Sequence, residues 1–169
     1  EIGLNKIGHK WLPYNKGGDF RKWYGNDDYV VNWENDGYDI KSFKDESTGR
    51  IRSHNYNGEF SFCEGITWSA FSSRGASFRH SDTKYLFDSK GSKGFCKPQY
   101  KKNIFYILAL LNSCVGECYL SFVAGAKDKK PGHISSVPII FFNKYLEQVT
   151  TVTKNLIEDS HTDWDAFES

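Results

Sequence analysis

The clearest periodic pattern in the chain lies between Asn103 and Val123, where apolar side chains recur every three or four residues. They are Ile104, Ile107, Leu108, Leu111, Val115, Cys118, Tyr119 and Phe122. This spacing places them on one face of a helix, so we predict a single buried amphipathic helix that stops at Gly125. A second helix is predicted from about Lys144 to Glu158, which either packs on the domain or continues as a coiled coil. Its apolar positions are Tyr145, Val149, Val152 and Leu156.

Short apolar runs bounded by turn residues predict strands in other parts of the chain. The candidates are Tyr29–Trp33, ending at the turn signal Asn35–Gly37; Phe60–Trp68; the pair Ser77–Arg79 and Tyr85–Phe87, joined at Ser81–Asp82; and Val137–Phe142, as a strand or extended segment. Gly91, Gly94 and Pro98 are expected to break any regular element between them. The pattern therefore predicts an α/β (α+β) fold in which a twisted, mostly antiparallel sheet is flanked by helices.

The length of 169 residues is enough for one domain with its own core. We assign residues 1–142 to this domain and residues 143–169 to a C-terminal helix and acidic linker, because five acids and no Lys or Arg follow from Glu158. The chain has no Met and begins with Glu, so we expect either a fragment whose linker leads to a further domain or a sequence with residues replaced. No signal peptide is recognised, and the apolar run Ile104–Leu111 is too short to span a bilayer.

Positive charge is concentrated locally, although the net charge of the chain is only +1. Between Arg74 and Lys102 there are eight Lys or Arg residues and two acids, as a surface that meets phosphates requires. A second, donor-rich run precedes the strand candidate at Phe60 and contains Arg50, Arg52, His54, Asn55 and Asn57. Arg and Asn pair with guanine and adenine edges, and the hydroxyls of Ser69, Ser72 and Ser73 can donate to phosphate or base. Composition alone supports solvated loops equally well.

Motifs for other chemistry are largely missing from the sequence. Gly91–Gly94 has the wrong spacing for a phosphate-binding loop, and neither a G-x-S-x-G elbow nor an H-E-x-x-H helix occurs. A zinc site would need Cys63 and Cys96 to converge on Cys114 and Cys118, so four free thiols in a reducing cytoplasm are favoured. A Cys–His dyad stays open, but the sequence favours no independent enzyme.

Several stretches resemble the adenine-specific DNA methyltransferases of BREX phage-defence systems (the PglX type). They are Phe20–Gly25 with Tyr29–Gly37, Gly65–Ser69 with the Ser72–Ser73 loop and Arg79, and Tyr85–Asp88. The segments Ile107–Ser113 and Ile134–Ile139 resemble a pattern shared with target recognition domains of restriction-modification enzymes, including type I specificity subunits. Trp164–Ser169 resembles the linker that follows the domain in this family. The resemblance covers nearly the whole chain.

The resemblance implies a C-terminal target recognition domain that docks on double-stranded DNA while another domain transfers a methyl group from S-adenosylmethionine to adenine N6. The family's Asn-Pro-Pro-Tyr motif does not occur here, so no catalytic residue, metal or cofactor is expected in this part of the protein. Expected partners are duplex DNA, the methyltransferase domain of the same chain and other defence proteins, in the cytoplasm and without a membrane. The alternative is a protein-interaction module that docks defence components or a DNA-mimicking phage inhibitor.

The expected DNA contacts combine the donor-rich run, the serine loop and nearby cations. They are Arg50, Arg52, His54, Asn55, Ser72, Ser73, Arg74 and Arg79, with Lys93 and Lys129 as backbone clamps. The segments Arg74–Phe78 and Ser89–Gln99 cannot be matched to the family residue by residue, so the base-reading residues are not assigned by the resemblance.

Overall fold

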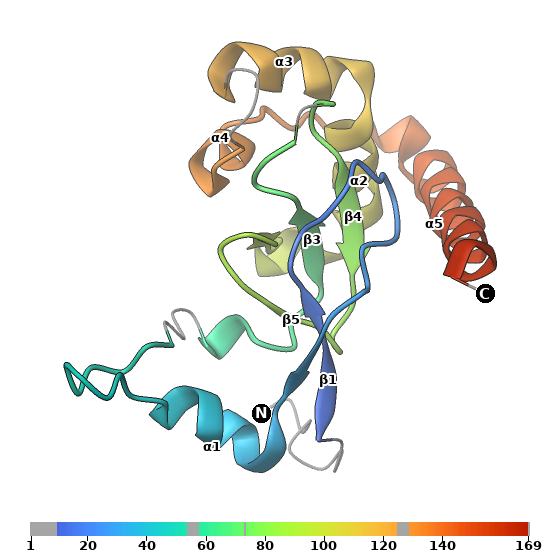
Figure 1. Cartoon of the computed structure of the whole chain (residues 1–169). Coiled ribbons are helices and arrows are strands. Elements are labelled where there is room, and N and C mark those ends of the chain that lie inside the picture. The colour runs from blue at the N-terminus through green and yellow to red at the C-terminus, as the bar shows by residue number, and fades with distance from the viewer. Residues whose placement is uncertain (1–9, 54–57, 73, 125–128, 169) are drawn as a thin grey trace.

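The computed structural model describes residues 10–53, 58–72, 74–124 and 129–168, which form two small three-stranded sheets surrounded by helices (Figure 1). Three of the four strand pairings in these sheets are antiparallel, so the predicted α+β fold class is confirmed. In Figure 1, β1 and α1 lie at one end of the molecule, α3 and α4 lie at the other, and α5 runs along one side.

The first sheet has the order β2-β1-β5. Its strands are β1 (Trp11–Asn15), β2 (Val30–Asn32) and β5 (Leu86–Phe87). β2 is antiparallel to β1 and confirms the strand predicted at residues 29–33, whereas β5 runs parallel to β1 on its other side. The turn signal after β2 is also confirmed, because Asn35, Asp36 and Gly37 all have positive φ angles, of 52°, 58° and 69°.

The second sheet places β3 (Gly65–Trp68) between β4 (Phe78–Ser81) and β6 (Lys93–Gly94). The predicted pairing of residues 77–79 with 85–87 is wrong, because β4 pairs with β3 and β5 joins the other sheet. The strand predicted from Phe60 is also shorter than expected. Phe62 has a φ of 63°, which interrupts an extended backbone, so β3 begins only at Gly65.

Helical elements account for most of the remaining regular structure. They are α1 (Glu34–Ser42), η2 (Gly58–Phe60), η3 (Pro98–Asn103), α2 (Ile104–Asn112), α3 (Cys114–Ala124), α4 (Pro131–Ser135), η4 (Asn143–Tyr145) and α5 (Leu146–Glu168). The segment 137–142 belongs to no described helix or strand.

The single helix predicted over residues 103–123 is wrong, because the chain bends by 71° between the η3–α2 segment and α3. Ser113 stands at the bend with extended angles (φ −74°, ψ 162°), and its hydroxyl accepts a hydrogen bond from the Gly116 N–H at 3.2 Å. This contact caps the start of α3, as serine commonly does. A Cβ on Gly116 would lie 2.3 Å from the Leu110 carbonyl oxygen, so the tight bend requires glycine there.

The core lies where α2 packs on β3 and β4. Its buried members are Ile66, Trp68, Ala76, Phe78, Ile104, Ile107, Leu108, Leu111, Leu120 and Val137. All four residues of β3 are buried, and α2 supplies four of the ten core residues.

α5 extends the second predicted helix to Glu168, so the acidic segment expected as a linker is helical. It packs along α2, and its Trp164 is only 9% exposed. A Cβ on Gly25 would lie 2.9 Å from the Trp164 ring, which shows how closely the end of α5 approaches the loop after β1.

Among the described residues, no single helix has both the length and the apolar character needed to cross a membrane. Only the bent pair Pro98–Asn112 and Cys114–Ala124 meets these criteria, and only when its two parts are taken together.

Candidate nucleic-acid interface

A glycine-containing loop, residues 16–20, follows β1 and lies between two hollows in the surface. Gly17 has a φ of 81°, and a Cβ there would lie 2.9 Å from the Lys90 carbonyl oxygen. Ser69, just after β3, holds the next residue: its hydroxyl accepts from the Gly18 N–H at 3.0 Å and donates to the Gly18 carbonyl at 2.9 Å. The loop is therefore fixed to the second sheet, and position 17 favours glycine on both conformation and space.

Arg79 braces this loop from inside the protein. It is 2% exposed, and its guanidinium donates to the Arg21 carbonyl at 3.1 Å and to the Ser69 hydroxyl at 3.3 Å. Burial lowers the pKa of Arg79 to about 10, and the nearby charge of Asp27 acts in the opposite direction, so the side chain stays charged at neutral pH. In this structure Arg79 supports the surface from below, and its predicted contact with DNA stays a prediction.

Gly18 and Asp19 line both hollows. The first, of about 460 Å³, is lined by Lys16, Arg21, Asn26, Asp28, Tyr29 and Trp164 besides the loop. The second, of about 360 Å³, is lined by Phe20, Phe71, Ser72 and Arg74. Acids occur in both hollows, so a phosphate backbone is better accommodated at their cationic rims than inside them.

Lysine ammonium groups lie close to aromatic rings in and beside these hollows. The Lys90 ammonium lies 5.4 Å from the centre of the Phe71 ring, and Phe71 is 62% exposed. The Lys16 ammonium lies 5.8 Å from the ring of Tyr29. Arg74 is exposed as well. We call this set the glycine-loop surface: Lys16, Tyr29, Phe71, Ser72, Arg74 and Lys90. It offers charge for phosphates and aromatic faces for unstacked bases.

The two lysines expected to clamp a DNA backbone are buried. Lys93 is 7% exposed and donates to the Asp82 carbonyl at 3.0 Å, and burial lowers the pKa of its ammonium to about 8. Lys129 is 4% exposed, and its backbone carbonyl accepts a hydrogen bond from the Trp68 indole N–H at 2.8 Å. As placed here, both residues connect internal elements, and neither ammonium is presented on an open surface.

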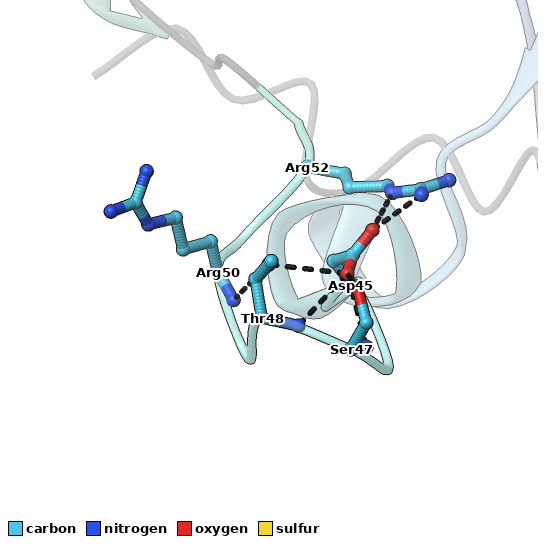
Figure 2. Close-up of polar contacts among 5 residues, drawn as sticks. All are labelled: Asp45, Ser47, Thr48, Arg50 and Arg52. Carbon is cyan, nitrogen blue, oxygen red and sulfur yellow. Dashed lines mark hydrogen bonds and ion pairs between the residues drawn. The ribbon is translucent and has the colours of Figure 1, made fainter.

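Arg50 and Arg52 lie on a separate hairpin whose turn is organised by Asp45 (Figure 2). One oxygen of the Asp45 carboxylate accepts from the backbone N–H and the hydroxyl of both Ser47 and Thr48, at 2.5–3.1 Å. The other accepts from Nε of Arg52 at 2.8 Å and also from its Nη2. Hydrogen bonds from Ser47 and Arg52 hold the pKa of Asp45 well below its usual range. Arg52 is thus used internally, whereas the Arg50 guanidinium points away from the carboxylate in Figure 2.

The structure therefore brings together only part of the predicted set. Ser72 and Arg74 share the glycine-loop surface, whereas Arg50 and Arg52 line neither hollow. The other predicted contacts His54, Asn55 and Ser73 lie outside the described residues. Sequence reasoning missed Lys16, Tyr29, Phe71 and Lys90. For Lys16, the sequence signal is the pair Gly17–Gly18 that follows it, just after the aromatic-containing segment Trp11–Asn15.

The described residues also bear on other site chemistry. No group of three or more His, Cys, Asp or Glu side chains within them is arranged to hold a metal ion. The four cysteines are free thiols, two exposed and two half-buried. His80 and Glu64 approach to 2.8 Å at the surface, as a simple polar pair.

Comparison with known proteins gives two close relatives, while no family model matches the chain. The chain is 47% identical over 159 residues to an adenine-specific methyltransferase PglX of Lacticaseibacillus casei (strain Zhang), covering 94% of the chain and 13% of that protein. It is 36% identical over 166 residues to an adenine-specific methyltransferase BrxX of Escherichia coli O9:H4 (strain HS), covering 98% of the chain and again 13% of the relative. The chain is thus homologous to PglX and BrxX, and it spans about 13% of the length of these relatives.

Proposed function

We propose that this chain is the duplex-DNA target recognition module of an adenine-specific DNA methyltransferase of BREX-type phage defence. The observation that carries the proposal is the homology, which extends over nearly all of the chain but only 13% of each relative. The described residues have a buried core of their own, as a separate module needs.

The glycine-loop surface is the part of the fold best suited to hold the DNA backbone. Lys16, Arg74 and Lys90 can each neutralise a phosphate, and the exposed ring of Phe71 can pack against a sugar or an unstacked base. The hydrogen bonds of Ser69 to Gly18 hold the loop backbone in place, so these groups are presented on a fixed support.

In this proposal the chain itself carries no methyl transfer. The rest of a larger cytoplasmic protein binds S-adenosylmethionine and modifies an adenine rotated out of the duplex, as enzymes acting on bases commonly do. The module supplies the docking surface that fixes which adenine is reached, and its other partners are the methyltransferase domain and further defence proteins.

Fluorescence anisotropy of the chain on a mixed-sequence duplex, titrated with salt, tests the proposal. We expect binding whose affinity falls linearly in log salt, because phosphate contacts release counterions. Arg74→Ala and Lys90→Ala should each weaken binding to all duplexes and reduce the salt slope by about 1. Lys144→Ala, at an exposed lysine outside both hollows, is the matched control for charge and should change neither.

Failure to bind at low salt would instead favour a protein-interaction module, which one observation supports. On α3, Phe122 is 83% exposed and Val115 is 66% exposed, a combination that suits a protein partner better than a phosphate. Docking on this face would be nearly insensitive to salt. Phe122→Asp would abolish it, whereas the DNA-recognition proposal expects this variant to bind DNA normally.

A further inference from the structure

We propose that the hairpin from Phe43 to Arg52 is a groove-reading arm, which enters the major groove of duplex DNA and presents Arg50 to a guanine edge. This inference rests on the proposed function and names the element that reads the bases. Three features of the hairpin support it. The turn is held by hydrogen bonds, the hairpin lies away from the core, and one of its two arginines takes no part in those hydrogen bonds.

Backbone hydrogen bonds close the segment into a short antiparallel ribbon that holds a single β-bridge. The Arg52 N–H donates to the Phe43 carbonyl at 2.9 Å, and the Asp45 N–H donates to the Arg50 carbonyl at 2.8 Å. Lys44 and Ile51 form an antiparallel bridge between these two pairs. The major groove of B-DNA admits a ribbon of this kind, whereas the minor groove is about half as wide.

The turn of the ribbon is fixed before any partner arrives. The Gly49 N–H donates to the Asp45 carbonyl at 2.8 Å, in addition to the side-chain contacts of Asp45 with Ser47, Thr48 and Arg52 (Figure 2). At the base, the Ser53 hydroxyl donates to the Ile40 carbonyl of α1 at 2.5 Å. A surface element held in this way loses little conformational entropy when it binds.

This rigidity does not serve the hydrophobic core. The ribbon lies beyond α1 at the edge of the molecule, in teal in Figure 1, and no other described element packs extensively against α1. Phe43 and Ile51 are 57% and 51% exposed, so the ribbon buries little apolar surface. An element that is internally locked but external to the core is suited to contact something outside the protein.

The chemistry of the tip favours base edges over a protein surface. From Glu46 to Arg50 the tip carries no apolar side chain, whereas protein interfaces rely on buried aromatic and apolar anchors. Arg52 is engaged with Asp45, but Arg50 is exposed and makes no side-chain hydrogen bond or ion pair within the described residues. A guanidinium presented in this way can pair with O6 and N7 of guanine.

Glu46 indicates the groove rather than the backbone as the place of contact. Its carboxylate is exposed beside Ser47 at the tip, where it would be repelled by phosphates. In the major groove the same carboxylate can accept a hydrogen bond from the amino group of cytosine, the partner of guanine.

The test uses the chain and the duplex that it selects from a random pool. Affinity for this duplex and for a scrambled one is measured for wild type, Arg50→Ala and Arg74→Ala, over a range of salt. We expect Arg50→Ala to reduce the ratio of the two affinities by about 5- to 150-fold, the range for one bidentate base contact, with the salt slope unchanged. Arg74→Ala should weaken both duplexes alike and leave the ratio intact.

Replacement of each guanine of the selected duplex by 7-deazaguanine removes the N7 acceptor. At one position this should weaken wild type but have no effect on Arg50→Ala, which would identify the contacted base. A preference retained by Arg50→Ala overturns the groove-reading arm and leaves the proposed function standing. If Arg50→Ala reduces the salt slope by about 1 and retains the ratio of the two affinities, Arg50 contacts a phosphate. This result also overturns the groove-reading arm. A wild-type chain that binds no duplex overturns the proposed function itself.

Discussion

The side chain of Asn112 closes the outer edge of β4, and this contact gives a direct test of how the second sheet is completed. Asn112 is 5% exposed at the end of α2. Its amide oxygen accepts from the Phe78 N–H at 3.0 Å, and its amide nitrogen donates to the Phe78 carbonyl at 2.9 Å. The Phe78 carbonyl also accepts a hydrogen bond from the Trp23 N–H at 2.9 Å, whereas the Phe78 N–H is satisfied by the Asn112 side chain. Asn112 thus replaces one residue of a further strand.

The cost of removing this contact can be worked out from these bonds. In Asn112→Leu the Phe78 N–H loses its partner inside the protein, which costs about 1–3 kcal/mol, and one net hydrogen bond to the carbonyl is lost, at about 1 kcal/mol. We therefore expect a loss of about 2–4 kcal/mol of unfolding free energy. For a chain of this size that corresponds to a fall in Tm of about 4–16 °C.

Asn112→Asp changes the same contact without changing its shape. The acceptor oxygen is retained, but a carboxylate oxygen now faces the Phe78 carbonyl in a buried site. Burial and this repulsion raise the folded-state pKa of the new carboxyl, so the loss of stability is small below its unfolded pKa, near 4, and grows as the pH rises toward the folded value. At low pH the protonated acid can donate to the carbonyl as the amide does.

Urea and thermal unfolding followed by circular dichroism from pH 3.5 to 7.5 provide the assay. Asn143→Asp makes the same chemical change at an exposed position and serves as the control. If Asn112→Asp stayed within about 0.5 kcal/mol of wild type at neutral pH, a change typical of surface substitutions, the edge-closing role of Asn112 would be refuted.

Three further predictions concern buried groups elsewhere in the fold. Because burial lowers the pKa of Lys93 from 10.5 to about 8, the unfolded state binds more protons above pH 8. The contribution of Lys93 to stability should then rise by roughly 2 kcal/mol between pH 8 and 10, and Lys93→Met should remove this contribution in urea titrations. A Cβ on Gly91 would lie 2.2 Å from the Asn15 carbonyl oxygen, so Gly91→Ala should cost about 1–3 kcal/mol in the same assay. Trp164→Ala should cost about 3 kcal/mol and raise hydrogen exchange at the end of α5 and near Gly25.

Elements with a local signal were predictable from the sequence, and elements decided by distant contacts were not. The periodic apolar positions predict the helical character of α2 and α5. The turn residues that follow β2 predict that strand. The bend at Ser113 cannot be predicted in this way, because the same apolar spacing continues through α3. Only the hydrogen bonds between Asn112 and Phe78 of β4 show where α2 must end. The pairing of β5 with β1 is also non-local, and the short run at residues 86–87 does not reveal its partner.

The candidate site was less predictable than the fold, since charge in a sequence does not reveal exposure. Arg79 and Lys93 occupy short strands in a basic segment, and both are buried by neighbours far along the chain. Ser72 and Arg74 follow a buried strand in a polar loop, and there Arg74 is exposed. The different roles of Arg50 and Arg52 depend on Asp45, whose geometry no spacing rule predicts.

The way the chain crosses between its sheets determines which parts could be exchanged between relatives. β1 needs β5 from much later in the sequence, and Trp164 of α5 covers Gly25 near the start, so a chimaera joined in the middle would separate strands from their partners. The Phe43–Arg52 ribbon is different, because its two ends meet at one backbone pair and its turn contacts lie within it, with only its base held to α1. It could be transplanted alone, which makes it the natural cassette for attempts to re-engineer specificity.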